Sequence, residues 1–208
     1  MESAKKRAIK KAALPLAEPI NPDKERQQEP QQKREAIKAV FLKERVMTED
    51  SGEAKDLYNK SRYGKLNAAG KVQLSLTEAY YLLEKGRMEV MDGNGRSLTL
   101  EAFANKARRI EPNFWIRYCV YKDFRDRGYI IKTALKFGAD FRVYERGIKP
   151  GDDHAKWIVY PVHEASTLTW YEFAAKNRVA HSTKKRLMIA VVDDEDDVSF
   201  WEVRWTRP

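Results

Sequence analysis

Three kinds of side chain in the second half of the chain could together carry out acid–base chemistry on RNA. Tyr144 ends a strand-like run, and His154 stands where the turn at 149–153 meets the next strand-like run. A basic triplet at 184–186 opens a later strand-like run. A phenol, an imidazole and an ammonium can supply a base, an acid and a fixed positive charge, which metal-free cleavage of RNA by its own 2′-hydroxyl requires. That reaction gives a 2′,3′-cyclic phosphate and a 5′-hydroxyl.

The other titratable residues have simpler explanations. His163 follows a strand-like run, so we expect a structural or surface role for it. His181 lies between a predicted helix and a predicted strand, so we expect it in a loop. Asp152 and Asp153 could bind Mg²⁺, which leaves a metal-dependent nuclease as an alternative, but turn residues need no metal to explain them. No His or Cys partners stand at zinc-like spacing, and the single cysteine, Cys119, excludes an internal disulfide. We therefore expect no metal site and no cofactor.

The charge balance favours a partner that carries phosphate. The 208 residues include 40 Lys and Arg against 31 Asp and Glu, which gives a net charge of +9 and a pI of about 9.5. A cationic surface attracts phosphate backbones and releases counterions on binding. No apolar run approaches the roughly 20 residues of a membrane helix, and the first residues contain no apolar stretch fit for a signal peptide. With a single cysteine, this favours a cytoplasmic protein with no membrane partner.

The chain divides into a tail and two folded units. Residues 1–36 combine basic residues with frequent Pro and Gln and few aromatics, which predicts a flexible tail. Residues 37–107 predict a small N-terminal mixed α/β domain, and residues 112–208 predict a C-terminal domain built on a mixed sheet. The fold class expected is therefore α/β (α+β), with 42% hydrophobic residues to build its core.

The first unit is expected to alternate short strands and helices. Its clearest helix covers 74–86, because Ser75 and Glu78 form a capping box and Gly86 fits the position just beyond the helix end. No group of residues here suggests catalysis, so we expect this unit to serve packing or docking. The remaining elements expected are strands at 39–41, 45–47 and 88–90, a helix between Ser51 and Gly64, and a helix at 99–107.

The second unit is expected to contain two helices and five strands. One helix covers 115–127 and ends at Gly128. The other covers 169–178, where Thr169 and Glu172 form a second capping box. The strand-like runs are rich in β-branched and aromatic residues and lie at 129–132, 140–144, 156–162, 187–192 and 198–205.

Long motifs in the chain resemble the archaeal tRNA-splicing endonuclease family. The resemblance covers about residues 37–208 and leaves the tail outside it. The motifs keep the order and spacing found in the family. In the second unit they are RGYIIK (127–132), KFGADFRVYERG (136–147), KPG (149–151) with His154, RVAHSTKK (178–185) and AVVDD (190–194); in the first unit they are LYNK (57–60), YGK (63–65) and LSLTEA (74–79).

The resemblance implies a role for each candidate catalytic residue. Tyr144 matches the general base that acts on the 2′-hydroxyl, and His154 matches the general acid for the departing oxygen. Lys185 matches the lysine that stabilises the transition state. The implied protein is a metal-independent endoribonuclease that excises introns from precursor tRNA, and the alternative is a non-catalytic RNA-binding or structural subunit of such a complex.

Two neighbouring lysines compete for the transition-state role. The family pattern Ser-Val-Arg-Lys falls on residues 182–185, so its last position favours Lys185 over Lys184. Since an ordinary tyrosine has a pKa of about 10, a basic role for Tyr144 near neutral pH requires a nearby cation, Lys185 or Arg146, that favours the phenolate. Lys184 and Arg146 are expected to face the RNA.

The family selects its substrate by an RNA shape, a bulge–helix–bulge at the exon–intron junctions. Bulged bases can be splayed out and held between an arginine plane and an aromatic ring. Arg178 matches an arginine used in this way, and Trp205 lies where relatives have a stacking aromatic. A core position on a strand face is an equally good explanation of Trp205.

Five consecutive acidic residues need an explanation in a protein that binds RNA. Such a run is usually a solvated turn, but the family implies a loop that docks into a basic pocket of a neighbouring subunit. A substrate with two cleavage sites then meets two active sites in a homotetramer, with a two-chain heterotetramer as the alternative. The run consists of Asp193, Asp194, Glu195, Asp196 and Asp197.

Overall fold

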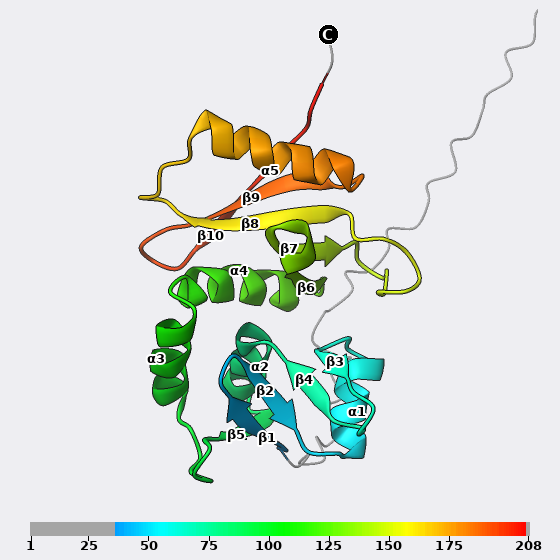
Figure 1. Ribbon diagram of the computed structural model, residues 1–208, viewed down its shortest axis with the longest axis vertical. Coiled ribbons are helices and arrows are strands. Elements are labelled where there is room, and N and C mark those ends of the chain that lie inside the picture. Colours follow the sequence, from blue (N-terminus) through cyan, green and yellow to red (C-terminus); the bar gives the residue numbers. More distant parts are fainter. Residues whose placement is uncertain (1–35, 207–208) are drawn as a thin grey trace, which may run out of the picture. The chain divides into compact units, whose positions relative to one another are not determined.

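The computed structural model describes residues 36–206 (Figure 1). The predicted basic tail lies outside these residues, apart from residue 36. Within them the strands form two five-stranded mixed sheets, which confirms the expected fold class. In the same range no helix is long and apolar enough to cross a membrane.

The first sheet has the strand order β3-β4-β2-β1-β5. β1 pairs antiparallel with β2 and parallel with β5, so the strands expected at 39–41, 45–47 and 88–90 are neighbours in this sheet. The short strands β3 and β4 were not predicted, and the helix that Ser51 caps ends well before Gly64. The elements are β1 (Ile37–Leu42), β2 (Arg45–Thr48), α1 (Gly52–Asn59), β3 (Lys65–Leu66), β4 (Val72–Leu74), α2 (Leu76–Glu84), β5 (Met88–Met91) and α3 (Leu100–Ile110).

The second sheet has the strand order β10-β9-β8-β7-β6. All of its neighbouring strands are antiparallel except β8 and β9, which are parallel and joined through helix α5. The elements are α4 (Phe114–Asp126), β6 (Ile130–Ala134), the 3₁₀ turn η1 (Leu135–Phe137), β7 (Ala139–Tyr144), β8 (Trp157–His163), α5 (Trp170–Ser182), β9 (Arg186–Val192) and β10 (Val198–Val203).

Local capping signals are present at the helix starts that the sequence predicted. The Ser75 hydroxyl accepts from the Glu78 amide while the Glu78 carboxylate accepts from the Ser75 amide, and Thr169 and Glu172 do the same at α5. The C-terminal end of α5 was predicted wrongly, because the helix continues to Ser182. β10 also stops two residues earlier than expected.

One hydrophobic core joins the two predicted domains. It runs from the first sheet through helices α2, α3 and α4 to one face of the second sheet. A smaller cluster fills the opposite face of the second sheet under α5, where Ile158, Tyr160 and Leu187 pack with Ala180. Helix α4 packs against the second sheet on one side and against α2 and α3 on the other, as the middle of Figure 1 shows.

Glu78 is the polar centre of the contact between the two sheets. Its carboxylate accepts hydrogen bonds from the Ser75 amide at 3.0 Å, the Gly64 amide at 2.9 Å and the Lys132 ammonium on β6 at 3.2 Å. The ammonium also donates to the Gly64 carbonyl at 2.8 Å. The side chains of Glu78 and Lys132 are only 8% and 14% exposed. Burial alone would raise the pKa of Glu78, but the charge of Lys132 and the hydrogen bonds outweigh it and lower that pKa.

Replacing Glu78 should cost far more stability than replacing an exposed acid. In Glu78→Gln the Lys132 ammonium stays buried without its counter-charge, so we expect a loss of about 3–5 kcal/mol in the free energy of unfolding. Because folding lowers the pKa of Glu78, its stabilising effect is present above its unfolded pKa and is lost as pH falls through the folded value. The wild type should therefore lose more stability than the variant below about pH 5.

Denaturant titrations at several pH values test this, with Asp56→Asn on α1 as the matched control. Asp56 pairs with Lys60 at 2.6 Å on the exposed surface, so its loss should cost less than about 1 kcal/mol. Equal losses for the two variants would contradict the central role of Glu78.

Candidate active site at the end of the second sheet

The register of three strands brings Tyr144 and Lys185 to the same end of the second sheet. Val143 on β7 lies opposite Trp157 on β8, which lies opposite Arg186 on β9. The last residue of β7 and the first residues of β8 and β9 therefore form one row, which we call the Tyr144 end. Since neighbouring strands are about 4.8 Å apart, the backbones of Tyr144 and Lys185 lie about 10 Å apart, with β8 between them.

Backbone hydrogen bonds extend this row beyond the regular strands. The Lys156 amide donates to the Val143 carbonyl at 2.9 Å, and the Arg186 amide donates to the Lys156 carbonyl at 2.9 Å. Lys156 thus lies between Tyr144 and Lys185 in the extended register, and its side chain pairs with Glu145. The pairing holds the backbones of the three strands in place at the Tyr144 end.

Tyr144 and Lys185 also share one face of the sheet. Val143 packs into the core on the α4 side, so the alternation of side chains directs Tyr144 to the α5 side. Leu187 packs in the cluster under α5, and Lys185, two residues earlier, has the same orientation. Consistent with this, the Lys185 ammonium lies 5.6 Å from the ring centroid of Phe137, which packs against that cluster. The Tyr144 side chain is nearly buried, at 4% exposure.

The two neighbouring lysines play different structural parts. The Lys184 amide donates to the His181 carbonyl and the Lys185 amide donates to the Ala180 carbonyl, which together form a Schellman motif at the end of α5. Lys184 occupies its left-handed position with φ of +54°, where glycine is usual. The exposed Lys184 thus turns the chain, whereas the half-buried Lys185 enters the sheet, and its ammonium donates to the Thr183 carbonyl at 2.9 Å.

His154 lies in the connection between β7 and β8. It is exposed, and its amide donates to the Asp153 carboxylate at 2.6 Å. The next residue, Ala155, is buried and anchors the connection directly before Lys156. Across residues 36–206, no hydrogen bond joins the side chains of Tyr144, His154 and Lys185.

A hollow of about 260 Å³ borders Lys185 on the side of β10. His181 and Trp205 both line it, and their rings meet edge to face with centroids 4.8 Å apart. His181 belongs to the last turn of α5, so its assignment to a loop was wrong. Trp205 lies beyond the end of β10 and is 51% exposed, so a core position on a strand is also wrong.

The other predicted RNA-binding arginines lie on two sides of this region. Arg178 is exposed on α5, about one helical turn before His181. Arg146 is exposed in the turn after β7, where its guanidinium lies 4.8 Å from the ring centroid of Tyr129. Arg146 therefore belongs to the Tyr144 end, and Arg178 adjoins Asn177, which lines the hollow.

Sequence reasoning missed a carboxylate that joins three strands here. Glu202 on β10 accepts from the Trp157 indole at 2.8 Å, from Arg186 at 3.1 Å and from Arg204 at 2.9 Å. Two of these donors, Arg186 and Arg204, line the same hollow as Lys185. The signal in the sequence is only an alternating strand, which does not reveal cross-strand partners.

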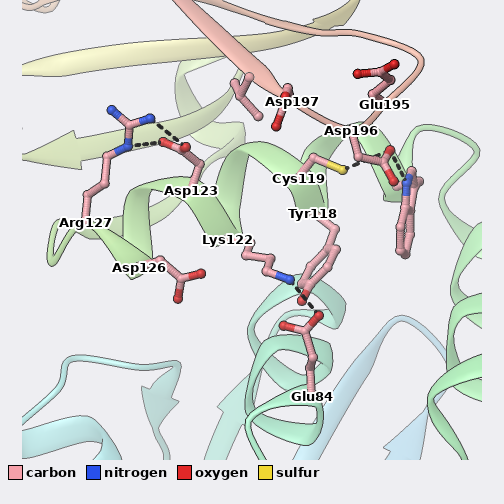
Figure 2. A pocket seen from close by; sticks show the side chains of 12 residues that line it. Glu84, Tyr118, Cys119, Lys122, Asp123, Asp126, Arg127, Glu195, Asp196 and Asp197 are labelled. Carbon is pink, nitrogen blue, oxygen red and sulfur yellow. Dashed lines mark hydrogen bonds and ion pairs between the residues drawn. The ribbon is translucent and has the colours of Figure 1, made fainter.

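The acidic run forms the turn between β9 and β10, at the other end of the sheet. The Asp193 carboxylate accepts from the amides of Glu195 and Asp197, which closes the turn. The Asp194 carboxylate lies 3.2 Å from the His163 imidazole. Figure 2 shows that the Asp196 carboxylate reaches down to α4.

Asp196 ties this turn to helix α4. It accepts from the Trp115 indole at 2.6 Å and from the Cys119 thiol at 3.5 Å. Between the turn and α4 lies a pocket of about 590 Å³, whose lining includes the acids Glu84 and Asp126. Burial, together with the charge of Asp196, raises the pKa of Cys119 to about 12.

Side chains of the types that bind metals do not cluster in the described part of the chain. Within residues 36–206, no three or more His, Cys, Asp or Glu side chains are arranged to hold a metal ion. Asp152 is exposed, and Asp153 is used to accept from the backbone of His154.

Comparison with known proteins places both parts of the chain in one family. Residues 114–200 match the family described as tRNA intron endonuclease, catalytic C-terminal domain, and residues 37–104 match tRNA intron endonuclease, N-terminal domain. The tRNA-splicing endonuclease of Thermococcus gammatolerans is 44% identical over 164 residues, which is 79% of this chain and 95% of the relative. The tRNA-splicing endonuclease of Nanoarchaeum equitans is 48% identical over 142 residues, 65% of this chain and 90% of the relative.

Burial, together with the contact with Asp196, should make the Cys119 thiol unusually unreactive. With a pKa of about 12, Cys119 should react with iodoacetamide at pH 8.5 at least about 10²-fold more slowly than a free thiol with a pKa of about 8.5. Asp196→Asn removes the neighbouring charge, lowers the pKa and should raise the rate. Mass spectrometry of timed samples measures both rates, and a wild-type rate equal to that of free cysteine would contradict the contact.

Proposed function

This chain belongs to the tRNA intron endonuclease family, and we propose that it cleaves precursor tRNA without a metal at both exon–intron junctions, through Tyr144, His154 and Lys185. The family makes it a tRNA-splicing endonuclease with an N-terminal and a catalytic domain. The observation that carries the assignment of residues is the strand register that places Tyr144 and Lys185 at one end and on one face of the sheet. We place this activity in the cytoplasm.

The proposed reaction exchanges one P–O bond for another. Tyr144 takes the proton of the 2′-hydroxyl, and the 2′-oxygen bonds to the adjacent phosphorus. The bond from phosphorus to the 5′-oxygen breaks, and His154 gives that oxygen a proton. The Lys185 ammonium stabilises the additional negative charge on the phosphorane. The products are a 2′,3′-cyclic phosphate and a 5′-hydroxyl, so no water enters this step.

Substrate recognition is proposed to use bulged bases at each junction. A base that leaves the helix can stack on Trp205, which is half-exposed beside the hollow at Lys185. Arg178, exposed on α5 nearby, offers the opposing guanidinium plane, with Arg146 and Lys184 toward the phosphates. The proposed substrate is a precursor tRNA with a bulge–helix–bulge.

Two cleavage sites in one substrate call for two active sites in one assembly. We propose a homotetramer in which the turn at 193–197 docks on a neighbouring subunit. The contacts of Asp193 and Asp196 within their own chain give the turn a fixed shape, and the exposed Glu195 and Asp197 side chains offer charge to a partner. A heterotetramer with a second kind of chain is the alternative assembly.

The proton donor is tested with an intron-bearing transcript in excess EDTA. His154→Ala should lower the single-turnover rate at least about 10²-fold and leave RNA affinity nearly unchanged, because His154 acts on the leaving oxygen. Asp152→Asn, in the same turn, is the matched control and should cleave normally. Analysis of the termini should find 2′,3′-cyclic phosphate. If EDTA stops cleavage by the wild type, or if Asp152→Asn does not cleave, a metal-dependent mechanism replaces this one.

The lysine assignment is tested separately. Lys185→Ala should reduce the cleavage rate at least about 10²-fold, whereas Lys184→Ala, in the exposed turn, should have a much smaller effect. Rates for both variants are measured at saturating enzyme, with binding to a 2′-deoxy substrate measured in parallel. If the two effects are reversed, Lys184 carries the charge in place of Lys185.

The assembly is tested by neutralising the acidic turn. Replacing the exposed Glu195 and Asp197 by Gln and Asn keeps the internal hydrogen bonds of the turn and removes two charges from its surface. Light scattering after size-exclusion chromatography should then show a shift from tetramer to dimer. A variant that remains tetrameric at the same concentration excludes docking through these charges.

A further inference from the structure

Arg142 lies on the strand that leads to Tyr144. It is two residues before Tyr144 on β7, so the two side chains emerge on the same face of the sheet. The guanidinium carbon of Arg142 lies 5.9 Å from the centroid of the Tyr144 ring. This is also the face that carries Lys185, as the alternation along β9 indicates. The half-buried Arg142 therefore lies beside Tyr144, on the same face of the sheet as the candidate active site.

The structure gives this guanidinium no anionic partner. Within residues 36–206, Arg142 forms no ion pair, and its Nε atom is buried without a hydrogen-bond acceptor. Arg117, by contrast, also has a buried Nε but reaches the carboxylates of Glu111 and Asp140. Burying a charged donor without an acceptor is costly, so a group outside the described chain is the natural candidate for the missing acceptor.

The carboxylates near Arg142 are already used by other cations. On the neighbouring strand β6, Lys132 lies directly opposite Arg142 and holds Glu78. At the Tyr144 end, Glu145 pairs with Lys156. On the other side, Arg142 lies opposite Ile158, an apolar residue of β8. Arg142 is thus an uncompensated positive charge between an occupied ion pair and an apolar strand.

We propose that Arg142 binds a phosphodiester of the RNA beside Tyr144 and so positions the substrate for cleavage. A guanidinium offers paired N–H groups that match two oxygens of one phosphate, and the nearby carboxylates Glu78 and Glu145 already pair with lysines. The inference rests on the proposed function, because it takes Tyr144 as the residue next to the scissile bond. It adds Arg142 to the residues that contact substrate.

Arg142→Met tests the proposal by moving binding and stability in different directions. Methionine keeps much of the length without the charge, so RNA affinity should fall about 10-fold or more. The slope of log affinity against log salt should become shallower by about 0.7–0.9, the value for one lost phosphate contact. The free energy of unfolding should stay equal or increase, because a buried unsatisfied group has been removed. Affinity is measured with an intron-bearing RNA that has a 2′-deoxy nucleotide at each cleavage site.

Two further variants separate the loss of a specific phosphate contact from a general loss of positive charge. Arg142→Lys keeps the charge without the paired donors, so it should recover the salt slope and only part of the affinity. Arg96→Met removes a charge from the exposed turn after β5 and should change neither affinity nor slope by the amount seen at Arg142. If Arg142→Met binds RNA as Arg96→Met does, or if its loss of affinity merely follows a loss of stability, the proposal is wrong.

The outcome for Arg142 is distinguishable from the outcome for the proposed function. If the wild type cleaves in EDTA but Arg142→Met leaves RNA affinity unchanged, only the role of Arg142 is overturned. Failure of the wild type to cleave, with RNA binding that still depends on Arg142, would overturn the catalytic proposal and retain a phosphate site at this position.

Discussion

The register of β7, β8 and β9 is the constraint on which the candidate site depends. Because side chains alternate along a strand, a slip of one residue in either pairing would move Tyr144 or Lys185 to the opposite face. The parallel pairing of β8 with β9 requires a crossover, and α5 supplies it. The Schellman motif at Lys184 then fixes where β9 begins. The helix end, the crossover and the strand register are thus parts of one arrangement.

Strand β9 separates the acidic turn at 193–197 from the basic residues at the Tyr144 end of the sheet. β9 has seven residues from Arg186 to Val192, so it carries the chain about 20 Å away from Lys185. The acidic turn begins where β9 ends, and at physiological salt its field is screened over about 8 Å. Five acids can therefore be accommodated in an RNA-processing enzyme without repelling the substrate at the Tyr144 end. The tie between Asp196 and α4 keeps the turn at that distance.

What could be predicted from the sequence depends on how local each signal is. The capping boxes at Ser75 and Thr169 act over three residues, so they predicted the starts of α2 and α5. The end of α5 was predicted too early because a lysine, Lys184, and not a glycine occupies the left-handed position after the helix. For this reason His181 was expected in a loop, although it lies in the helix. The ends of the predicted strands marked Tyr144 and the basic triplet as candidates. Their proposed roles, and the preference for Lys185 over Lys184, came from the resemblance to the family.

Other features depend on partners that are remote in the chain and have no local signal. Glu202 on β10 accepts from donors on β8 and β9, and Lys132 reaches Glu78 from the other sheet, 54 residues away. The sequence shows that such charges exist, but only the sheet order shows which of them meet. This is also why Arg142 looked like one basic residue among many until its neighbours on β6 and β8 were known.

Glu78 and Arg142 are opposite cases of a partly or fully buried charged group. Glu78, at the contact between the sheets, has donors for both of its carboxylate oxygens and stabilises the folded state. At the Tyr144 end, Lys184 adopts a conformation that costs about 1–3 kcal/mol for a residue other than glycine. Arg142, nearby, has a buried donor without an acceptor. The Glu78 contact and the shared core supply stability that tolerates the strained backbone at Lys184 and the unpaired Nε of Arg142.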